Sequence, residues 1–176
     1  MKLLDDAKKF TGNVVCVGVT NEDLLRTLSK NKGASIFTID FTKRHGFFSR
    51  KKTKTADGRK VNIKKLRKTF KDKSIDTLIF DFNEMYDYFK YFISDSVAIG
   101  RGKVYIYGES RFIDPKNLIN RYKRYGTKAF LEVDGDSFLI VIDVEKAKSN
   151  WLKNKIYLVV DTFHNIGDMI SVALIS

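Results

Sequence analysis

The stretch GNVVCVGVTNEDLLRTLSKNKGASIFTID, residues 12–40, predicts a strand, a turn, a helix and a second strand. It opens with a run of valines without polar alternation, which is typical of a strand covered on both faces in a parallel sheet. Thr20 then offers an N-cap with Asp23 at the capping-box position, and leucines at helical spacing give the next segment one apolar stripe. A second apolar strand follows and ends in Asp40.

A turn containing Gly18 after the first strand, and an acid at the end of the second, are features by which open α/β sheets hold nucleotide and nucleoside cofactors. We therefore expect a ligand site in which Gly18 and Asp40 lie at the same edge of the sheet. A plain strand–helix–strand unit, with Asp40 as a solvated strand end, is the alternative that the sequence leaves open.

Length and composition indicate one domain. The chain has 176 residues, of which 43% are hydrophobic, enough for one core but not for two. The single cysteine, Cys16, excludes an internal disulfide and a cysteine-based zinc site, and fits a reducing compartment. No apolar run approaches the ~18 residues that a membrane span needs. We expect a single α/β domain over residues 1–176, cytoplasmic and without a membrane partner.

The positive charge lies in one segment. Residues 42–73 hold 14 of the 33 Lys and Arg but only two of the 21 Asp and Glu, so the rest of the chain is balanced. A block of this kind favours a polyanionic partner, with nucleic acid first and an anionic membrane second, whereas a lysine-rich exposed loop is the alternative. The residues expected to bind nucleic acid are Arg44, Arg50, Lys51, Lys52, Lys54, Arg59, Lys60, Lys64 and Lys68.

The basic segment 42–73 is predicted to be a loop with at most one short strand, followed by a helix that Asn62 caps, inserted after the second strand. Beyond it, residues 76–82 and 103–107 predict two more buried strands. Asp114 followed by proline predicts the start of a further helix. Tyr105, Tyr107 and Glu109 lie near the end of the second of these strands and are further site candidates.

The pattern changes towards the C-terminus. Residues 127–133 and 137–144 predict an antiparallel hairpin. Residues 155–161 and 169–175 predict two further strands, which either extend the sheet or pair across a dimer. The predicted fold class is therefore α/β: a Rossmann-like, mostly parallel sheet flanked by helices, with antiparallel strands at the C-terminal end.

In this order of elements, over residues 12–144, the chain resembles class I S-adenosylmethionine-dependent methyltransferases, whose Rossmann-like sheet carries an antiparallel hairpin after its last helix. The resemblance implies S-adenosylmethionine as cofactor, with Gly18 and Thr20 in the cofactor turn. It further implies that Asp40 binds the ribose hydroxyls and that Asp57, in TADGRK, contacts the adenine.

The segment DFNE, residues 81–84, is similar to the place of the catalytic residues in that family, so Asp81 and Asn83 are implied to orient the methyl acceptor. The segment lacks the two prolines of aminomethylating enzymes. In ribose 2′-O enzymes a lysine and further acids complete the set; Asp81 and Glu132 are available here, but Tyr107 stands where a lysine would serve.

The helix start distinguishes between cofactors. Glu22 and Asp23 place negative charge where dinucleotide sites hold a pyrophosphate, whereas the sulfonium and ammonium groups of S-adenosylmethionine tolerate carboxylates. The chain also lacks a GxxxxGK[ST] run. The leading hypothesis is a methyltransferase-like protein that acts on or binds nucleic acid. The alternatives are a non-catalytic Rossmann-like nucleic-acid-binding or accessory module, and a small-molecule methyltransferase with a lid over residues 43–60.

Overall fold

The computed structural model describes residues 2–39, 52–54, 60–62, 66–85, 89–111, 113–148, 155–157 and 159–160. Its main body is a six-stranded sheet of order β2-β1-β5-β6-β8-β7, accompanied by a two-stranded β3-β4 sheet. The elements are α1 (Lys2–Ala7), β1 (Gly12–Val17), α2 (Glu22–Lys30), β2 (Ala34–Ile39), β3 (Lys52–Lys54), β4 (Lys60–Asn62), the 3₁₀ helix η1 (Leu66–Lys68), β5 (Ile75–Asp81), α3 (Phe82–Met85), α4 (Phe89–Ile99), β6 (Gly100–Glu109), α5 (Pro115–Lys123), β7 (Lys128–Asp134) and β8 (Ser137–Asp143).

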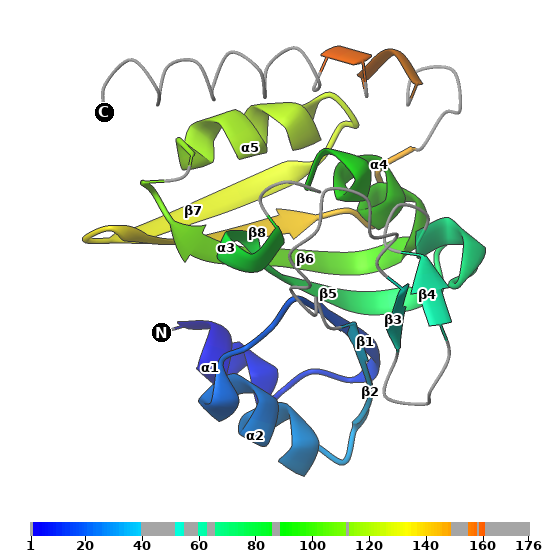
Figure 1. Cartoon of the computed structure of the whole chain (residues 1–176), viewed down its shortest axis with the longest axis vertical. Coiled ribbons are helices and arrows are strands. Elements are labelled where there is room, and N and C mark those ends of the chain that lie inside the picture. The colour runs from blue at the N-terminus through cyan, green and yellow to red at the C-terminus, as the bar shows by residue number, and fades with distance from the viewer. Residues whose placement is uncertain are drawn as a thin grey trace.

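The sheet is parallel through β2, β1, β5 and β6, and antiparallel at β8 and β7. Helices α1 and α2 cover one face, and α4 and α5 cover the other (Figure 1). This arrangement confirms the predicted fold class. Among the described helices, none has the length and apolar character that a bilayer crossing needs.

The valine run of β1 explains why this strand lies inside the sheet. Val14, Val15, Cys16 and Val17 are all buried. Because side chains alternate along a strand, Val15 and Val17 join the core under α4 and α5, while Val14 and Cys16 join the core under α1 and α2. The prediction of a strand covered on both faces is confirmed.

The sequence predicts the type of residue that caps each helix, but not always the residue number of the cap. Asp114 caps α5 and Pro115 occupies its first turn, as predicted. The cap of α2, however, is Asn21 rather than Thr20, and its side chain accepts a hydrogen bond of 2.9 Å from the Leu24 amide. Asparagine is the stronger capping residue, so the helix begins one position later and leaves Thr20 exposed in the turn.

The prediction of a helix after Asn62 is wrong. Asn62 is the last residue of β4, in a β3-β4 hairpin that exceeds the one short strand expected here, and the described part of the segment forms only the single turn η1. Leu66 is buried as the pattern predicted. A longer helix would place Lys64 and Lys68 on one face at i,i+4 spacing, where like charges repel.

The strand predicted at 155–161 is also wrong, because residues 155–157 and 159–160 are helical. The Tyr157 ring packs edge-on against Tyr125, with ring centroids 5.2 Å apart, and its hydroxyl donates to the Arg124 carbonyl. The segment therefore packs beside the end of α5 instead of adding a strand. Residues 169–175 lie outside the described residues, so the expectation of a strand there remains untested.

At the amino edge of the sheet, Asp76 at the start of β5 connects three strands. Its carboxylate accepts a hydrogen bond of 2.8 Å from the Asn13 amide of β1 and one of 3.0 Å from the Arg101 guanidinium of β6. The hydrogen bond from Arg101, and then the one from Asn13, hold the pKa of Asp76 below its ordinary value. Stability from this group is therefore present above its unfolded pKa and is lost as the pH falls through its folded pKa.

We expect Asp76→Asn to lower the free energy of unfolding at pH 7 by about 1–2 kcal/mol, because the charge-assisted hydrogen bonds are lost. Urea denaturation followed by circular dichroism measures this difference. The gap should shrink as the pH is lowered towards ~3, since the wild-type carboxylate is then being protonated. An equal gap at both pH values would contradict the electrostatic assignment.

Candidate functional site

The candidate site lies where the sheet connections reverse. From β1 the chain passes through α2, on one face, to β2; from β5 it passes through α3 and α4 to β6, with α4 on the other face. Open α/β sheets bind ligands at the point where the flanking helices change faces, at the carboxyl ends of the two strands concerned. Here that position is the carboxyl ends of β1 and β5, and we call it the crevice. Val17 pairs with Phe80, so Gly18 and Asp81 come next along the two strands.

The turn after β1 is fixed by its backbone. Gly18 is buried and has φ +67°, a conformation that strains residues with a side chain. Its amide donates a hydrogen bond of 2.9 Å to the carbonyl of Ile39, the last residue of β2. The turn is thereby tied to the strand end that Asp40 follows, although Asp40 and Asp57 themselves lie outside the described residues.

The end of β5 carries a buried carboxyl. Asp81 is 5% exposed and pairs in register with Tyr107 of β6. Burial raises its pKa, the charge of Glu84 acts in the same direction, and the Asn83 amide, which donates to the carboxylate at 3.2 Å, opposes the shift. Asp81 is therefore a group whose ionisation the fold disfavours.

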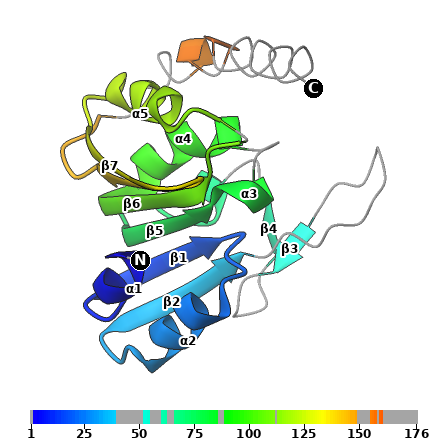
Figure 2. The ribbon, with the colours of Figure 1, turned by 90° about the vertical axis from the view of Figure 1, so that its left-hand side faces the viewer.

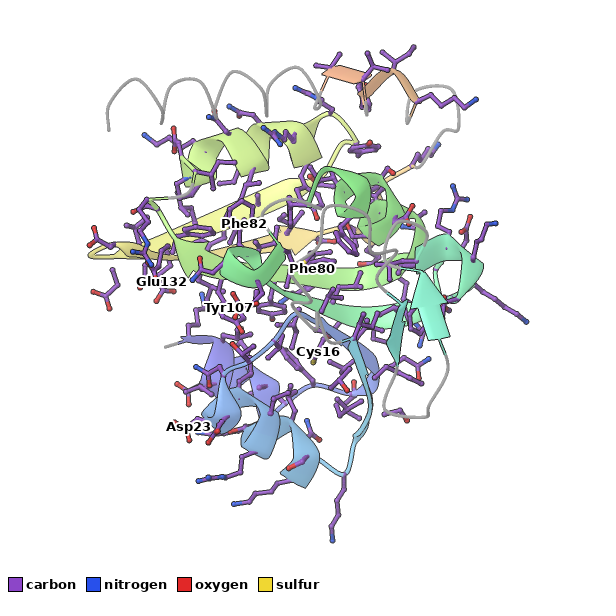
Figure 3. The ribbon with its side chains drawn as sticks, in the orientation of Figure 1. Cys16, Asp23, Phe80, Phe82, Tyr107 and Glu132 are labelled. Atoms are coloured by element: carbon purple, nitrogen blue, oxygen red, sulfur yellow. The ribbon has the colours of Figure 1, made fainter. Side chains whose placement is uncertain are left out.

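Tyr107 completes this part of the site. Its buried hydroxyl interacts with Asp81 but does not reach full hydrogen-bond geometry with any described residue. Burial, and then the charge of Asp81, raise the pKa of Tyr107, so the phenol stays protonated. Tyr107 and Cys16 lie on the sheet face that α1 and α2 cover (Figure 3). Hydroxyl and carboxyl together offer a donor and acceptors at the crevice.

Asn83 has a structural task. Its side-chain oxygen accepts a hydrogen bond of 2.9 Å from the Glu109 amide, which ties α3 to the end of β6. Gly108 makes this contact possible, because an added Cβ would lie 3.0 Å from the Asn83 oxygen and 2.9 Å from the Phe82 Cβ. Of the two residues predicted to be catalytic, Asp81 is a buried carboxyl with a raised pKa, whereas the side-chain oxygen of Asn83 already accepts a hydrogen bond from the backbone.

Two other candidates, Tyr105 and Glu132, lie away from the crevice, and the single cysteine is unreactive. The Tyr105 hydroxyl donates to Asp6 of α1, and its ring packs on Phe10. Glu132 lies on β7 in the same row as Tyr107, but β8 separates the two strands. Burial raises the pKa of Cys16 to about 12, so its thiol is not a nucleophile at neutral pH.

Among the described residues, several carboxylates border the crevice. Glu22 and Asp23 occupy the first turn of α2, as predicted, and the capping side chain of Asn21 fills the helix N-terminus. Glu84 lies on α3, just after the end of β5, and Glu109 is the last residue of β6, where it forms an ion pair with Arg111. Such a site disfavours a pyrophosphate and suits a ligand with a positively charged centre.

The basic hairpin lies at the same end of the molecule. Lys52 and Lys54 are on β3, and Lys60 pairs with Lys54 from β4. Figure 2 shows this hairpin on the side of the sheet where the parallel strands end, and it contacts β2 and η1. Lys68 is exposed on η1. The other residues predicted to bind nucleic acid lie outside the described residues; they are Arg44, Arg50, Lys51, Arg59 and Lys64.

The sheet order and the antiparallel β7-β8 hairpin define a Rossmann-like α/β fold, whose order of elements resembles that of class I methyltransferases. Among solved structures, the chain is similar to the release-factor-specific protein-(glutamine-N5) methyltransferase from Alicyclobacillus acidocaldarius subsp. acidocaldarius DSM 446. The two share 14% identity with a TM-score of 0.48, over 80% of this chain and 88% of that one, so no residue role is transferred. No family model and no curated protein matches the chain.

Sequence reasoning identified Asp81 from its place at a strand end and named Tyr107 only as a further candidate. It missed the bond between Asn83 and Glu109 and the role of Gly108. Both depend on the register of β5 against β6, for which the sequence gives no local signal. Only a glycine between Tyr107 and Glu109 hinted at a close approach.

Because the pKa of Asp81 is raised by burial, its ionisation should cost folding free energy as the pH rises above its unfolded value. We expect the free energy of unfolding of Asp81→Asn at pH 7.5 to exceed that of the wild type by about 0.5–2 kcal/mol, because proteins often gain stability when a charged site residue is neutralised. Thermal unfolding at pH 7.5 and at about pH 4 measures this, and the difference should shrink at the lower pH. The exposed Asp136→Asn is the control; destabilisation by Asp81→Asn alone would contradict the burial argument.

Proposed function

We propose that this chain is an S-adenosylmethionine-dependent methyltransferase-like protein that acts on or binds nucleic acid. The observation that supports this most directly is the crevice between β1 and β5, which has the Gly18 turn on one side and the buried Asp81 on the other. Ligands of open α/β sheets bind at such a reversal of strand order. The fold alone does not supply the reaction, so the proposal rests on the chemistry of these residues.

The residues at the crevice fit this cofactor. A glycine at φ +67° allows the backbone of the turn to approach a ligand closely, and Asp40 follows the strand end to which that turn is bonded. Glu22 and Asp23 disfavour a diphosphate but tolerate a sulfonium and an ammonium group. When bound, S-adenosylmethionine supplies an electrophilic methyl group.

The chain's own residues would prepare the methyl acceptor. Asp81 can accept a hydrogen bond or a proton from an acceptor N–H or O–H, and its raised pKa makes it a better base than an exposed aspartate. The Tyr107 hydroxyl, which has no partner of full geometry among the described residues, can donate to the same group. Asn83 and Gly108 hold α3 against β6 and so keep this edge in place.

The basic segment supports nucleic acid as the substrate or partner. It holds the whole charge excess of the chain, and the β3-β4 hairpin that it forms lies beside the carboxyl edge (Figure 2). Phosphates held there would place a nucleotide near the crevice while the acidic crevice itself repels them. A specific observation favours the alternative of a non-catalytic binding module: the Asn83 oxygen is committed to the Glu109 amide.

Calorimetric titration tests the cofactor. We expect S-adenosylmethionine and S-adenosylhomocysteine to bind with a Kd on the order of micromolar, and NAD not to bind. Asp40→Ala should weaken both by at least roughly tenfold, because hydrogen bonds to the ribose are lost. Asp5→Ala, which removes an exposed carboxylate of α1, is the control and should change nothing. Unchanged affinity in Asp40→Ala would refute the assignment of the site.

Fluorescence anisotropy with a labelled single-stranded RNA tests the partner. We expect affinity to fall steeply between about 50 and about 200 mM salt, because bound phosphates release counterions. Replacing Lys52, Lys54 and Lys60 by Ala should reduce the salt slope by about 0.7 for each phosphate that the hairpin no longer binds.

The matched control changes the same amount of charge elsewhere, at the exposed residues Lys9, Lys30 and Lys32. It should leave the salt slope unchanged. An equal reduction in both triple variants would indicate non-specific attraction and count against the hairpin as the binding surface. Affinity that is independent of S-adenosylhomocysteine would favour the non-catalytic module.

A further inference from the structure

β7 is the outermost strand of the sheet and is fully formed. All of its seven residues pair with β8 without a register shift, and no described strand pairs with its other side. It contains no proline and no bulge, two of the devices that protect such an edge, but it carries the charges of Lys128, Glu132 and Asp134. An edge of this length can therefore pair with a chain whose charges match its own.

The edge also exposes apolar side chains. Two of the most exposed large hydrophobic residues of the described structure lie on β7: Phe130 is 52% exposed to solvent, and Val133 is 56% exposed. At the opposite edge, Ile36, Phe37 and Ile39 of β2 are at least half-buried. Phe37 also packs against Phe70, with ring centroids 5.8 Å apart. The two edges therefore differ, and β7 is the one that lacks a cover among the described residues.

We propose that β7 pairs antiparallel with β7 of a second copy of this chain, about a two-fold axis at Leu131, so that the two sheets become one. An axis at this central residue pairs every residue of the strand, whereas an axis at a neighbouring residue leaves one end unpaired. The register places Lys128 opposite Asp134 of the partner subunit, and Ala129 opposite the partner's Val133.

The charges along β7 suit this pairing. Lys128 begins the strand and Asp134 ends it, and both are exposed. In the antiparallel arrangement they form two equivalent pairs of opposite charge, one on each side of the axis, and such cross-strand pairs are stabilising. A second copy is therefore the partner whose charge pattern this edge matches; a parallel pairing would set like charges side by side.

The side chains next to these pairs are also complementary. Lys2 of α1 lies over the Phe130 ring, with its amine 4.3 Å from the ring centroid. The register places the partner's Glu132 opposite Phe130, and so beside that amine. The two Phe130 rings become diagonal neighbours across the interface, which is within reach of aromatic side chains. Pairing would bury the exposed surface of Phe130 and Val133 on both copies.

This interface leaves the crevice open. In the sheet order, β6 and β8 separate β7 from β5. Pairing at β7 therefore does not cover Gly18 or Asp81, and the inference does not rest on the proposed function.

The first test is the mass of the full chain in solution, by light scattering and sedimentation over a concentration series. We expect a dimer. Asp134→Lys should raise its dissociation constant by roughly tenfold, because two like-charge pairs with Lys128 replace two favourable ones. Adding Lys128→Asp to that variant exchanges the charges and should restore dimerisation. Asp136→Lys, in the adjacent turn and not on the strand, is the control and should dimerise like wild type.

The second test uses cysteines, because the single native thiol, Cys16, is buried. In the proposed register Leu131 lies opposite Leu131 of the partner subunit, so Leu131→Cys should form a disulfide-linked dimer on mild oxidation. Val133→Cys is the matched control, since the two Val133 positions lie four residues apart along the paired strands and should remain unlinked. A monomer at all concentrations, or a dimer insensitive to Asp134→Lys and linked equally well by both cysteines, would overturn the proposal.

Discussion

The position of β1 between β2 and β5 is the constraint on which the rest of the structure depends. The crossover from β1 to β2 and the crossover from β5 to β6 run in opposite directions along the sheet, and because both are right-handed, α2 and α4 lie on opposite faces. That separation opens the crevice at the carboxyl ends of β1 and β5. The hydrogen bond from the Gly18 amide to the Ile39 carbonyl then fixes the edge at which a ligand can approach.

The charges of the chain are divided in a way that matches two different ligands. The crevice is bordered by carboxylates from α2 and from the ends of β5 and β6, whereas the basic segment forms a hairpin beside the same edge. A cation close to the crevice and a polyanion along the hairpin satisfy both regions at once. A single small anionic ligand would satisfy only one of them, which is why the two halves of the proposed function belong together.

The parts of the fold that the sequence predicts are those with a strong local signal. The valine run of β1, the Asp114-Pro115 helix start and the hairpin between β7 and β8 are all confirmed. The errors come from choices that packing decides. Asn21 outcompetes Thr20 as a cap, and the Tyr157 segment is helical beside the end of α5. Similarly, Asp81 was predictable as a strand end, but its partner Tyr107 depends on strand register, which has no local signature.

The two aspartates of β5 lie in opposite electrostatic environments at the two ends of the strand. Asp76 accepts hydrogen bonds from β1 and β6, and its pKa is lowered, so its charge strengthens the sheet. Asp81 is buried with a raised pKa, beside a tyrosine hydroxyl without a full hydrogen bond. An asparagine would preserve the contact with the Asn83 amide without the cost of a buried charge. Burial therefore makes the charge of Asp81 unfavourable in the fold, although hydrogen bonding from Tyr107 and Asn83 opposes this effect, and the proposed function assigns that acidity to a ligand.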